Sequence, residues 1–309
     1  MIKIGTRGSR LALWQAHYVA DLLKKEGIES EIVVIETKGD KILNKSLSKI
    51  GSKGIFTAEL EEQLFKKKID IAVHSAKDVQ SELPKGLQII AYTEREQPHD
   101  VLISYNKNSK LIDFDKSFVV GTSSTRRISL LKHFYPHIRT AESRGNLQTR
   151  MKKLEEGYYD ALILAYAGVL RMDYHDLIVE SLPVDSFTPA VGQGTIAVEA
   201  AETLSESKKQ TIRRLVNHSL TEQCMLIERA YLRALQGGCS VPVFGLATWQ
   251  NDGLIEMNAG IVSLDGQTLL RRQQIIAPKD DLEKNGEAIA LQLLDDGADK
   301  ILQQVKKGQ

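Results

Sequence analysis

The sequence predicts an α/β protein made of two α/β domains and a smaller α+β domain at its C-terminal end. Three observations lead to this prediction. Short apolar runs alternate with amphipathic stretches over the first two-thirds of the chain, loops interrupt this alternation twice, and the last third contains closely spaced strand-like runs. Alternating strands and helices are typical of a mainly parallel sheet covered by helices. The chain has 309 residues, which is enough for more than one hydrophobic core.

The first α/β domain begins at the N-terminus. Strands are expected at residues 2–5, 31–35 and 69–73, where apolar and β-branched residues gather. One helix is expected from Arg10 onward, and a second near residues 56–64, because apolar residues recur there every three or four positions. These residues are Leu13, Ala16, Ala20 and Leu23 in the first helix, and Phe56, Leu60 and Leu64 in the second.

The second α/β domain follows a polar stretch at residues 93–100. Strands are expected at 101–104, 118–121 and 160–165, and a helix at 125–134. A second break, at 183–194, contains two prolines and two glycines, and the strand-like run 195–199 after it is expected to return to the first domain. Two crossings between the same domains would form a hinge. The predicted limits are 1–94 with 195–214 for the first domain and 95–194 for the second.

The third domain, predicted at residues 215–309, has a different pattern. A helical stretch at 205–235 is expected to be interrupted near His218. Strand-like runs at 241–248, 254–262 and 268–276 are joined by Asn-Asp-Gly and Asp-Gly turns, which favour hairpins and a three-stranded antiparallel sheet. One helix at about 280–305 is expected to close the chain.

Composition excludes several classes of function. The chain has 41 basic and 40 acidic side chains, so bulk charge does not favour a nucleic-acid binder. No apolar run approaches the roughly 20 residues that span a bilayer, and no signal-peptide pattern opens the chain. We therefore expect a cytoplasmic protein without a membrane partner. The cysteines, Cys224 and Cys239, are too few for a disulfide framework, and no zinc spacing occurs, so no metal is expected.

Several arginines follow predicted strands. Arg7 lies in the polar loop after the first strand, and Arg126 and Arg127 follow a Ser/Thr run that can cap a helix after strand 118–121. Open α/β sheets bind ligands beyond the carboxyl ends of their strands, so these cations are expected to face one cleft and an anion. Arginine suits carboxylates, which it can bind with two hydrogen bonds. The alternative is a set of weak surface ion pairs. Further basic residues of this kind are Arg144, Arg150 and Arg171.

Three other features allow two interpretations each. Asp78 follows a buried-looking strand and is either a cleft carboxylate that moves protons or a residue that caps a turn. Cys239, between a glycine pair and a Val-Pro strand start, is either an attachment point or an incidental thiol, whereas Cys224 lies in a helical stretch and is expected in the core. The basic segment 45–56 is either a solvated loop or a lid over an anionic ligand.

Six motifs resemble the hydroxymethylbilane synthase (porphobilinogen deaminase) family in order and spacing, over nearly the whole chain. They are TRGSRLALWQAHYV at 6–19, VHSAKDV at 73–79, GTSSTRR at 121–127, SRGNLQTR at 143–150, TPAVGQG at 188–194 and GGCSVPV at 237–243. The resemblance implies two periplasmic-binding-protein-like (type II) lobes with mixed sheets, a cleft between them, and a third domain that carries the cofactor cysteine.

The resemblance also implies an activity. A dipyrromethane cofactor, made from two porphobilinogen units, would be joined by a thioether to Cys239. Four more porphobilinogens would be added one at a time with loss of ammonia, giving enzyme-bound polypyrrole intermediates, and water would then release hydroxymethylbilane. A monomer, and neither a metal nor a nucleotide, is the family expectation.

Site residues are implied by the same resemblance. Asp78 matches the catalytic aspartate. The residues expected at the cofactor are Lys77, Ser124, Arg126, Arg127, Asn146 and Arg150, together with Cys239. Those expected at the substrate are Arg7, Ser9, Arg144, Arg171, Gln193, Lys49, Lys53 and Phe56.

Two positions depart from the family pattern: Gln80 stands where a proline is frequent, and Ala58 where lysine is frequent. Both affect only local rigidity and charge. Two other functions compete with the synthase. A non-catalytic two-lobed anion-binding protein would explain the lobes but not Cys239, and an RNA-binding protein is disfavoured by the near-zero net charge.

Overall fold

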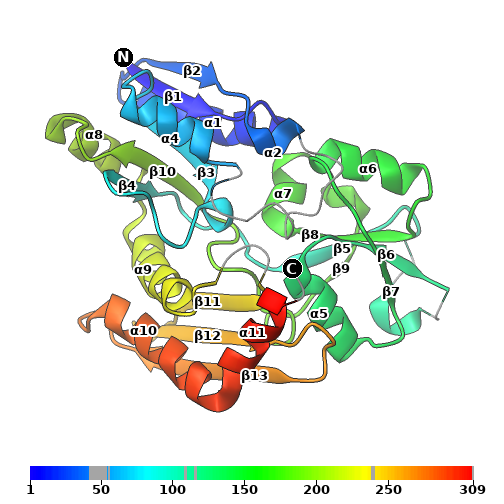
Figure 1. Ribbon diagram of the computed structural model, residues 1–309. Helices are drawn as coiled ribbons and strands as arrows, with labels where there is room; N and C mark the ends of the chain where they lie inside the picture. Colours follow the sequence, from blue (N-terminus) through cyan, green and yellow to red (C-terminus); the bar gives the residue numbers. More distant parts are fainter. Residues whose placement is uncertain (42–53, 55, 108–109, 115–116, 238–240, 308–309) are drawn as a thin grey trace.

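The computed structural model describes residues 1–41, 54, 56–107, 110–114, 117–237 and 241–307. Its strands form two five-stranded sheets and one three-stranded sheet, each covered by helices (Figure 1). The first lies at the upper left of the view, the second at the right, and the third below both.

The first sheet has the strand order β2-β1-β3-β10-β4, and we call it and its helices the first lobe. Its strands are β1 (Ile2–Thr6), β2 (Ser30–Val34), β3 (Ile71–Ser75), β4 (Leu87–Tyr92) and β10 (Ile196–Ala201). The first three strands are parallel, whereas β10 is antiparallel to both of its neighbours. The helices α1 (Arg10–Lys24) and α8 (Glu206–Val216) share a core with one face, and α4 (Ala58–Phe65) packs on the other.

The second sheet, in the order β7-β6-β8-β5-β9, forms the second lobe with its helices. Its strands are β5 (Asp100–Ile103), β6 (Val119–Gly121), β7 (Arg139–Ala141), β8 (Ala161–Ala165) and β9 (Ile178–Ser181). The helices are α5 (Thr125–Phe134), α6 (Leu147–Glu155) and α7 (Tyr166–Arg171). Strands β6, β7 and β8 are parallel, and β5 is antiparallel to both of its partners. Both large sheets are therefore mixed, and the second lobe is inserted between β4 and β10 of the first.

The third unit contains α9 (Ser219–Ala234), the antiparallel strands β11 (Val243–Trp249), β12 (Ile255–Val262) and β13 (Leu269–Ile276), and α10 (Leu282–Leu293).

The prediction of a single closing helix is wrong. A π-type turn at Leu294–Ala298 separates α10 from α11 (Asp299–Lys307), because Gly297 adopts a φ of 105°, which a regular helix does not allow. The interruption near His218 is confirmed, since α8 ends at Val216 and His218 caps α9.

The two crossings between the lobes lie side by side. Thr93 donates from its backbone to Ile196 at 3.0 Å, and Glu96 to Gly194 at 3.2 Å. Gly194 has a φ of +92°, and a Cβ there would approach the carbonyl oxygen of Glu96 to 2.3 Å. Only glycine allows this close contact. The prediction that the chain returns to the first sheet after the second break is confirmed, because β10 pairs with β3 and β4.

The remaining elements are short: α2 (Lys38–Lys41) and the 3₁₀ turns η1 (Ala76–Asp78), η2 (Leu111–Asp113) and η3 (His175–Leu177). Among the described helices, none is both long enough and apolar enough to span a bilayer. Within the same residues, no three His, Cys, Asp or Glu side chains gather in a way that could hold a metal ion.

Candidate active site

Most of the predicted site residues follow the carboxyl ends of parallel strands. Arg7 comes directly after β1, and Lys77 and Asp78 lie in η1 directly after β3. The second lobe repeats this arrangement. Its residues of this kind are Ser124, Arg126 and Arg127 after β6, Arg144, Asn146 and Arg150 after β7, and Arg171 after β8. The carboxyl end of a parallel strand is the usual place for a ligand in an open α/β sheet.

Three of the predicted polar residues are helix caps. The side chain of Ser9 accepts from Ala12 N at 3.3 Å, that of Ser124 from Arg127 N at 3.5 Å, and that of Asn146 from Thr149 N at 2.9 Å. Each therefore starts a helix that follows a strand: α1, α5 and α6. In this way the cap Ser124 fixes where Arg126 and Arg127 leave the backbone of α5.

Arg126 and Arg127 share a carboxylate that sequence reasoning missed. The Nη2 atom of Arg126 donates to Oδ2 of Asp100 at 2.7 Å, and Nη2 of Arg127 donates to Oδ1 at 2.7 Å. Asp100 is fully buried at the start of β5, which is antiparallel to β8 and so begins at the edge where β8 ends. Burial alone would raise the pKa of Asp100, but the two guanidinium groups hold that pKa well below its usual value, so the carboxylate is charged.

Arg126 and Arg127 also have N–H donors for which the described residues provide no acceptor. Their Nη1 atoms donate to backbone carbonyls, those of Thr188 and Ile163 respectively, at 2.9 and 3.0 Å. Their Nε atoms are buried and meet no acceptor among the described residues. Buried N–H donors ordinarily have partners, so these two are suited to the carboxylates of a bound group.

Lys77 and Gln193 extend this cluster toward the first lobe. Gln193 donates from Nε2 to Asp100 Oδ1 at 2.8 Å and to the carbonyl oxygen of Pro98 at 2.6 Å. Lys77 donates from Nζ to Gln193 Oε1 at 3.4 Å. Burial, followed by repulsion from Arg127, lowers the pKa of Lys77 to about 8. Lys77 can therefore gain or lose a proton near neutral pH.

Asp78 and Arg150 lie within electrostatic reach of the same cluster. The charge of Asp78 acts on the pKa of both Lys77 and Arg150, raising each, while Arg127 lowers both. Asp78 is partly buried in η1, and Arg150 donates from Nε to the carbonyl oxygen of Gly145 at 2.9 Å. The site thus combines four cations with Asp78 and Asp100.

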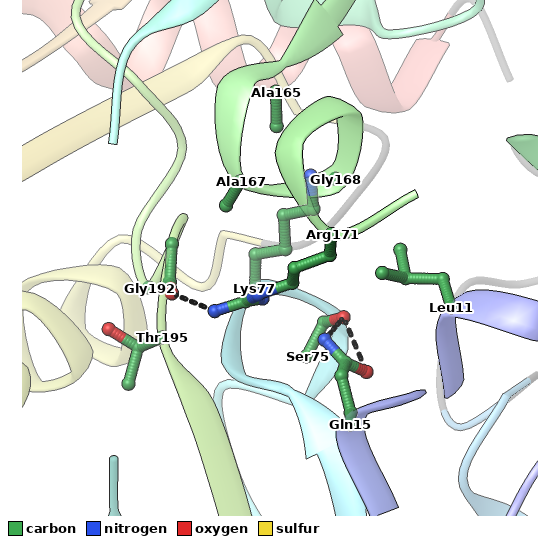
Figure 2. Close-up of a pocket in the computed structure, with 11 residues that line it drawn as sticks. Leu11, Gln15, Ser75, Lys77, Ala165, Ala167, Gly168, Arg171, Gly192 and Thr195 are labelled. Carbon is green, nitrogen blue, oxygen red and sulfur yellow. Dashed lines mark hydrogen bonds between the residues drawn. The ribbon is translucent and has the colours of Figure 1, made fainter. Parts of the chain in front are cut away.

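A pocket lies beside Lys77, between the lobes (Figure 2). The first lobe contributes Gln15, which donates to Ser75 Oγ at 2.8 Å, and the second contributes Arg171, which donates from Nη2 to the carbonyl oxygen of Gly194 at 2.8 Å. The residues that line the pocket are Leu11, Gln15, Ser75, Lys77, Ala165, Ala167, Gly168, Arg171, Gly192, Gly194 and Thr195. Gln15 and Ser75 were not predicted as site residues.

The other predicted residues have separate surroundings. The guanidinium carbon of Arg7 lies 4.2 Å from the ring centroid of Phe56, a cation–π contact, and Arg144 pairs with Glu142. Phe56 precedes α4 instead of lying in it, which corrects the predicted start of that helix.

Lys49, Lys53 and Cys239 lie outside the described residues. Cys224 is in the core as expected, and burial raises the pKa of its thiol to about 12.

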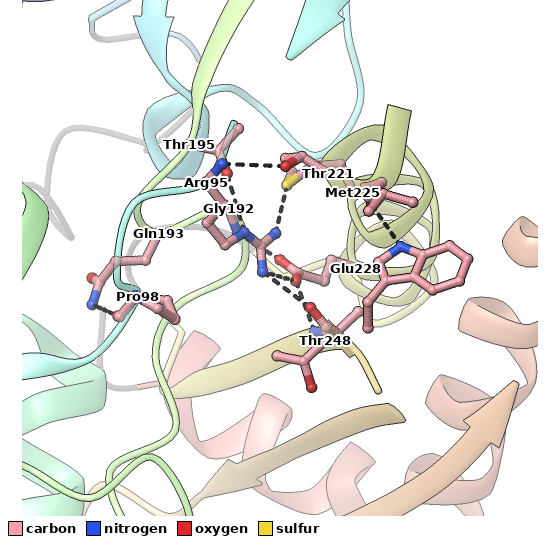
Figure 3. A network of polar contacts seen from close by, with 12 residues as sticks. Arg95, Pro98, Gly192, Gln193, Thr195, Thr221, Met225, Glu228 and Thr248 are labelled. Carbon is pink, nitrogen blue, oxygen red and sulfur yellow. Dashed lines mark hydrogen bonds and ion pairs between the residues drawn. The ribbon is translucent and has the colours of Figure 1, made fainter. Parts of the chain in front are cut away.

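A second buried network joins the crossings to the third unit (Figure 3). Glu228 on α9 is fully buried, and its Oε1 accepts from Arg95 Nη1 at 2.7 Å, while its Oε2 accepts from Gly192 N at 2.8 Å. Arg95 also donates from Nε to Thr195 Oγ1 at 3.1 Å. One carboxylate therefore binds both crossing segments. Sequence reasoning missed this residue, because a glutamate inside an amphipathic helix gives no local signal of burial.

The sequence did hold a weak signal for Asp100. It is a carboxylate placed directly before the apolar run 101–103, where a charge would be costly unless it were paired. Its partners are 26 and 27 positions away in the chain, so no local pattern reveals them.

The fold and the site define a two-lobed α/β protein with cations gathered where the lobes meet and a third unit joined to the crossing segments. Two family models match the chain: "Porphobilinogen deaminase, dipyromethane cofactor binding domain" over residues 2–209, and "Porphobilinogen deaminase, C-terminal domain" over residues 222–295. The chain belongs to the porphobilinogen deaminase family, a family of enzymes, and its first 209 residues include the domain that binds the dipyrromethane cofactor.

Relatives are similar over their whole length. A porphobilinogen deaminase of Cytophaga hutchinsonii is 53% identical over 307 residues, which cover 99% of this chain and 97% of that protein. One of Desulfosudis oleivorans is 47% identical over 308 residues, covering 100% and 99%. Among solved structures, a periplasmic substrate-binding protein of an ABC transporter from Coxiella burnetii aligns with 70% of this chain and 92% of its own, at 11% identity and a TM-score of 0.45.

Proposed function

We propose that this chain catalyses the hydroxymethylbilane synthase reaction, a group transfer that joins four porphobilinogen units on a dipyrromethane primer attached to Cys239. In each step the aminomethyl C–N bond of porphobilinogen breaks, ammonia leaves, and a C–C bond forms to the terminal pyrrole ring, which then loses a proton. Water finally cleaves the tetrapyrrole from the primer. The primer supplies the nucleophilic pyrrole carbon that starts the chain.

The observation that carries this proposal is the cluster of Arg126, Arg127 and Lys77 around Asp100. Two guanidinium groups bind one buried carboxylate, and Lys77 is joined to it through Gln193, so the cluster keeps an excess of positive charge. Two buried Nε donors are left for further acceptors. A primer of two pyrroles carries four carboxylates, which match both the charge and the donors. Residues proposed to hold the primer are Lys77, Ser124, Arg126, Arg127, Asn146, Arg150 and Cys239.

Asp78 is proposed as the catalytic carboxylate. It lies close enough to Lys77 and Arg150 to alter the pKa of both, so it borders the cationic cluster. Loss of ammonia from porphobilinogen leaves an electron-poor ring system, and a nearby carboxylate stabilises such positive charge best where little water enters. A carboxylate can also accept the proton that the ring loses in each step.

The incoming porphobilinogen is proposed to bind where the lobes meet. Arg171 borders the pocket of Figure 2, and Gln193 connects Lys77 to Asp100. The full set proposed for the substrate is Arg7, Ser9, Arg144, Arg171, Gln193, Lys49, Lys53 and Phe56. Arg7 belongs to the opposite lobe from Arg171, so the two could bind different carboxylates of one substrate.

Three further predictions concern the protein as a whole. The domain limits are proposed as 1–94 with 195–214, 95–194 and 215–309. The partners are proposed to be porphobilinogen and polypyrrole intermediates, without nucleic acid, and the enzyme to be a cytoplasmic monomer. Because a two-lobed anion-binding protein without catalysis would share the lobes, a test has to read out covalent chemistry.

Intact-protein mass is that test. The purified chain is expected to exceed its sequence mass by two porphobilinogen units less two ammonias, and peptide mapping is expected to locate the addition on Cys239. Cys224 serves as the internal control, because burial keeps its thiol protonated and unreactive. A chain of unmodified mass that still binds polycarboxylates would favour the non-catalytic alternative, and an addition on Cys224 would refute the assignment of Cys239.

A further inference from the structure

The carboxylate of Asp100 is fully buried and accepts three side-chain hydrogen bonds. Its Oδ1 accepts from Arg127 Nη2 at 2.7 Å and from Gln193 Nε2 at 2.8 Å, and its Oδ2 accepts from Arg126 Nη2 at 2.7 Å. Its own backbone is fixed as the first residue of β5, where its carbonyl oxygen accepts from Leu182 N at 2.9 Å. No part of Asp100 is therefore available to a ligand, and any effect it has on one must act through its neighbours.

Each arginine is held at two points. In each guanidinium group, one Nη atom donates to Asp100 and the other donates to a backbone carbonyl oxygen. That oxygen belongs to Thr188 for Arg126 and to Ile163 for Arg127. Two fixed contacts determine the orientation of a planar group, so the direction of each buried Nε–H is also determined. The donors left for a ligand are thereby preorganised.

The charge balance argues against a purely structural ion pair. A buried pair is ordinarily neutral, because an uncompensated charge inside a protein is costly. Here one carboxylate faces two buried guanidinium groups, and with Lys77, Arg150 and Asp78 counted the site holds four cations against two carboxylates. The remaining positive charge calls for an anion that the described residues do not supply, and such an arrangement is expected where an anionic group is bound.

We infer that Asp100 is a positioning residue for the primer: it holds the guanidinium groups of Arg126 and Arg127 side by side so that their remaining N–H donors bind the primer carboxylates. This inference rests on the proposed function, because it assumes that the cluster binds the primer. Asp100 itself touches neither the primer nor the reacting atoms.

The test measures primer loading instead of turnover. Apo-protein, produced in cells that cannot make porphobilinogen, is mixed with porphobilinogen, and the mass of the covalent adduct is followed over time. Asp100→Asn keeps the shape of the side chain and removes its charge. It is expected to load on the order of 100-fold more slowly than the parent chain, since misplaced binding groups typically cost that much. Asp100→Glu, which restores the charge, is expected to recover part of the rate.

Asp160→Asn is the matched control. Asp160 precedes β8, accepts from Val119 N at 2.7 Å and lies at the opposite edge of the same sheet, so its variant tests a lost carboxylate away from the cluster. It is expected to load like the parent. If Asp100→Asn does not fold, Asp100→Glu carries the test, because it keeps the charge and both arginines and displaces the carboxylate by about one methylene. It is expected to keep the thermal midpoint closer to that of the parent and to load more slowly than the parent.

The outcomes separate the two hypotheses. A parent chain that never gains the adduct would refute the proposed function. A parent that loads normally together with an Asp100→Asn variant that loads at the same rate would overturn the role of Asp100 and leave the proposed function intact. Where only Asp100→Glu folds, loading of that variant at the parent rate would likewise overturn it, because the position of the carboxylate would then not matter for loading.

Discussion

Arg171 donates a hydrogen bond from Nη2 to the carbonyl oxygen of Gly194 at 2.8 Å, so a cation of the second lobe is joined to the segment that returns to the first. The same guanidinium lies over the ring of Trp14 on α1, with its carbon 5.3 Å from the ring centroid. Arg126 and Arg127, by contrast, are bound within the second lobe by Asp100. The cations of the cleft thus form an inner group with fixed partners and an outer group where the lobes meet.

The inner and outer cations should have different roles in loading and elongation. Arg126→Leu or Arg127→Leu is expected to give protein without primer, since losing a charged contact to a buried partner costs on the order of 2–5 kcal/mol. Arg7→Leu, in the first lobe, is expected to keep the primer and to stall early in elongation. Intact mass before and after addition of porphobilinogen distinguishes these states. Equal primer content in all three variants, or its loss from all three, would contradict the division.

The charge of Asp78 should govern turnover more than binding. Asp78→Asn keeps the shape and removes the charge, so turnover by correctly loaded enzyme is expected to fall on the order of 100- to 1,000-fold. Asp78→Glu keeps the charge and displaces it by about one methylene, so it is expected to retain more activity. Steady-state kcat and KM measure the effect, and Glu82→Gln, at an exposed acid nearby, is the control. Near-normal kcat with a raised KM in Asp78→Asn would make Asp78 a binding residue.

The pH dependence of the free enzyme should report Lys77. Its pKa of about 8 means that the ammonium loses its proton, and the site one cation, as the pH rises through that value. The ratio kcat/KM is therefore expected to fall above about pH 8, because this ratio follows groups of the free enzyme. Lys77→Arg keeps the charge at high pH and is expected to remove this decline. An identical decline in Lys77→Arg would assign it to another group.

Lys77 should also affect stability in a defined direction. Its pKa is lower in the folded chain than its ordinary value, so the folded state binds fewer protons than the unfolded state above about pH 8. The protonated form therefore destabilises the fold, and the contribution of Lys77 to the free energy of unfolding is expected to increase from about pH 8 toward that ordinary value. Urea unfolding of apo-protein at several pH values checks this, with Lys77→Met lacking the effect.

The buried pair Arg95–Glu228 should be worth more to stability than an exposed pair. Arg95→Ala leaves Glu228, which is fully buried, without its charged partner, and is expected to lower the free energy of unfolding by about 3–5 kcal/mol. Arg213→Ala removes the pair with Glu222, where the side chains are 42% and 24% exposed, and should cost about 1 kcal/mol or less. Equal losses in both variants would show that burial of the Arg95–Glu228 pair has no special effect on stability.

Elements with a local signal were predictable. The helix at 125–134 agrees with α5 at both ends, because Ser124 provides a cap and the apolar spacing is regular. The strands β4, β7 and β9 were missed. β7 has only three residues, Arg139–Ala141, and β4 and β9 lie in segments where no clear alternation marks them. The break in the last helix was missed although it contains the sequence Asp295-Asp296-Gly297, since such a signal competes with a long apolar period.

The candidate site was predictable in its residue types but not in its pairings. Strand ends and helix caps located Arg7, Lys77, Asp78 and Arg126 near the carboxyl ends of the sheets. The role of Asp100 depends on β5 running antiparallel to β8, which brings the first residue of one strand to the end of the other. Such a pairing is a property of sheet topology, and one sequence without relatives does not specify it.

The insertion of the second lobe has a consequence for how the chain is made. Strand β10 is an inner strand of the first sheet, between β3 and β4, yet about a hundred residues separate it from β4 in the chain. A ribosome adds about 5–20 residues per second, so the nascent first lobe waits roughly 5–20 seconds with an unpaired edge while the second lobe is synthesised. An open strand edge invites pairing with other chains. The second lobe, whose strands are all contiguous in the sequence, should therefore complete its sheet on the ribosome before the first.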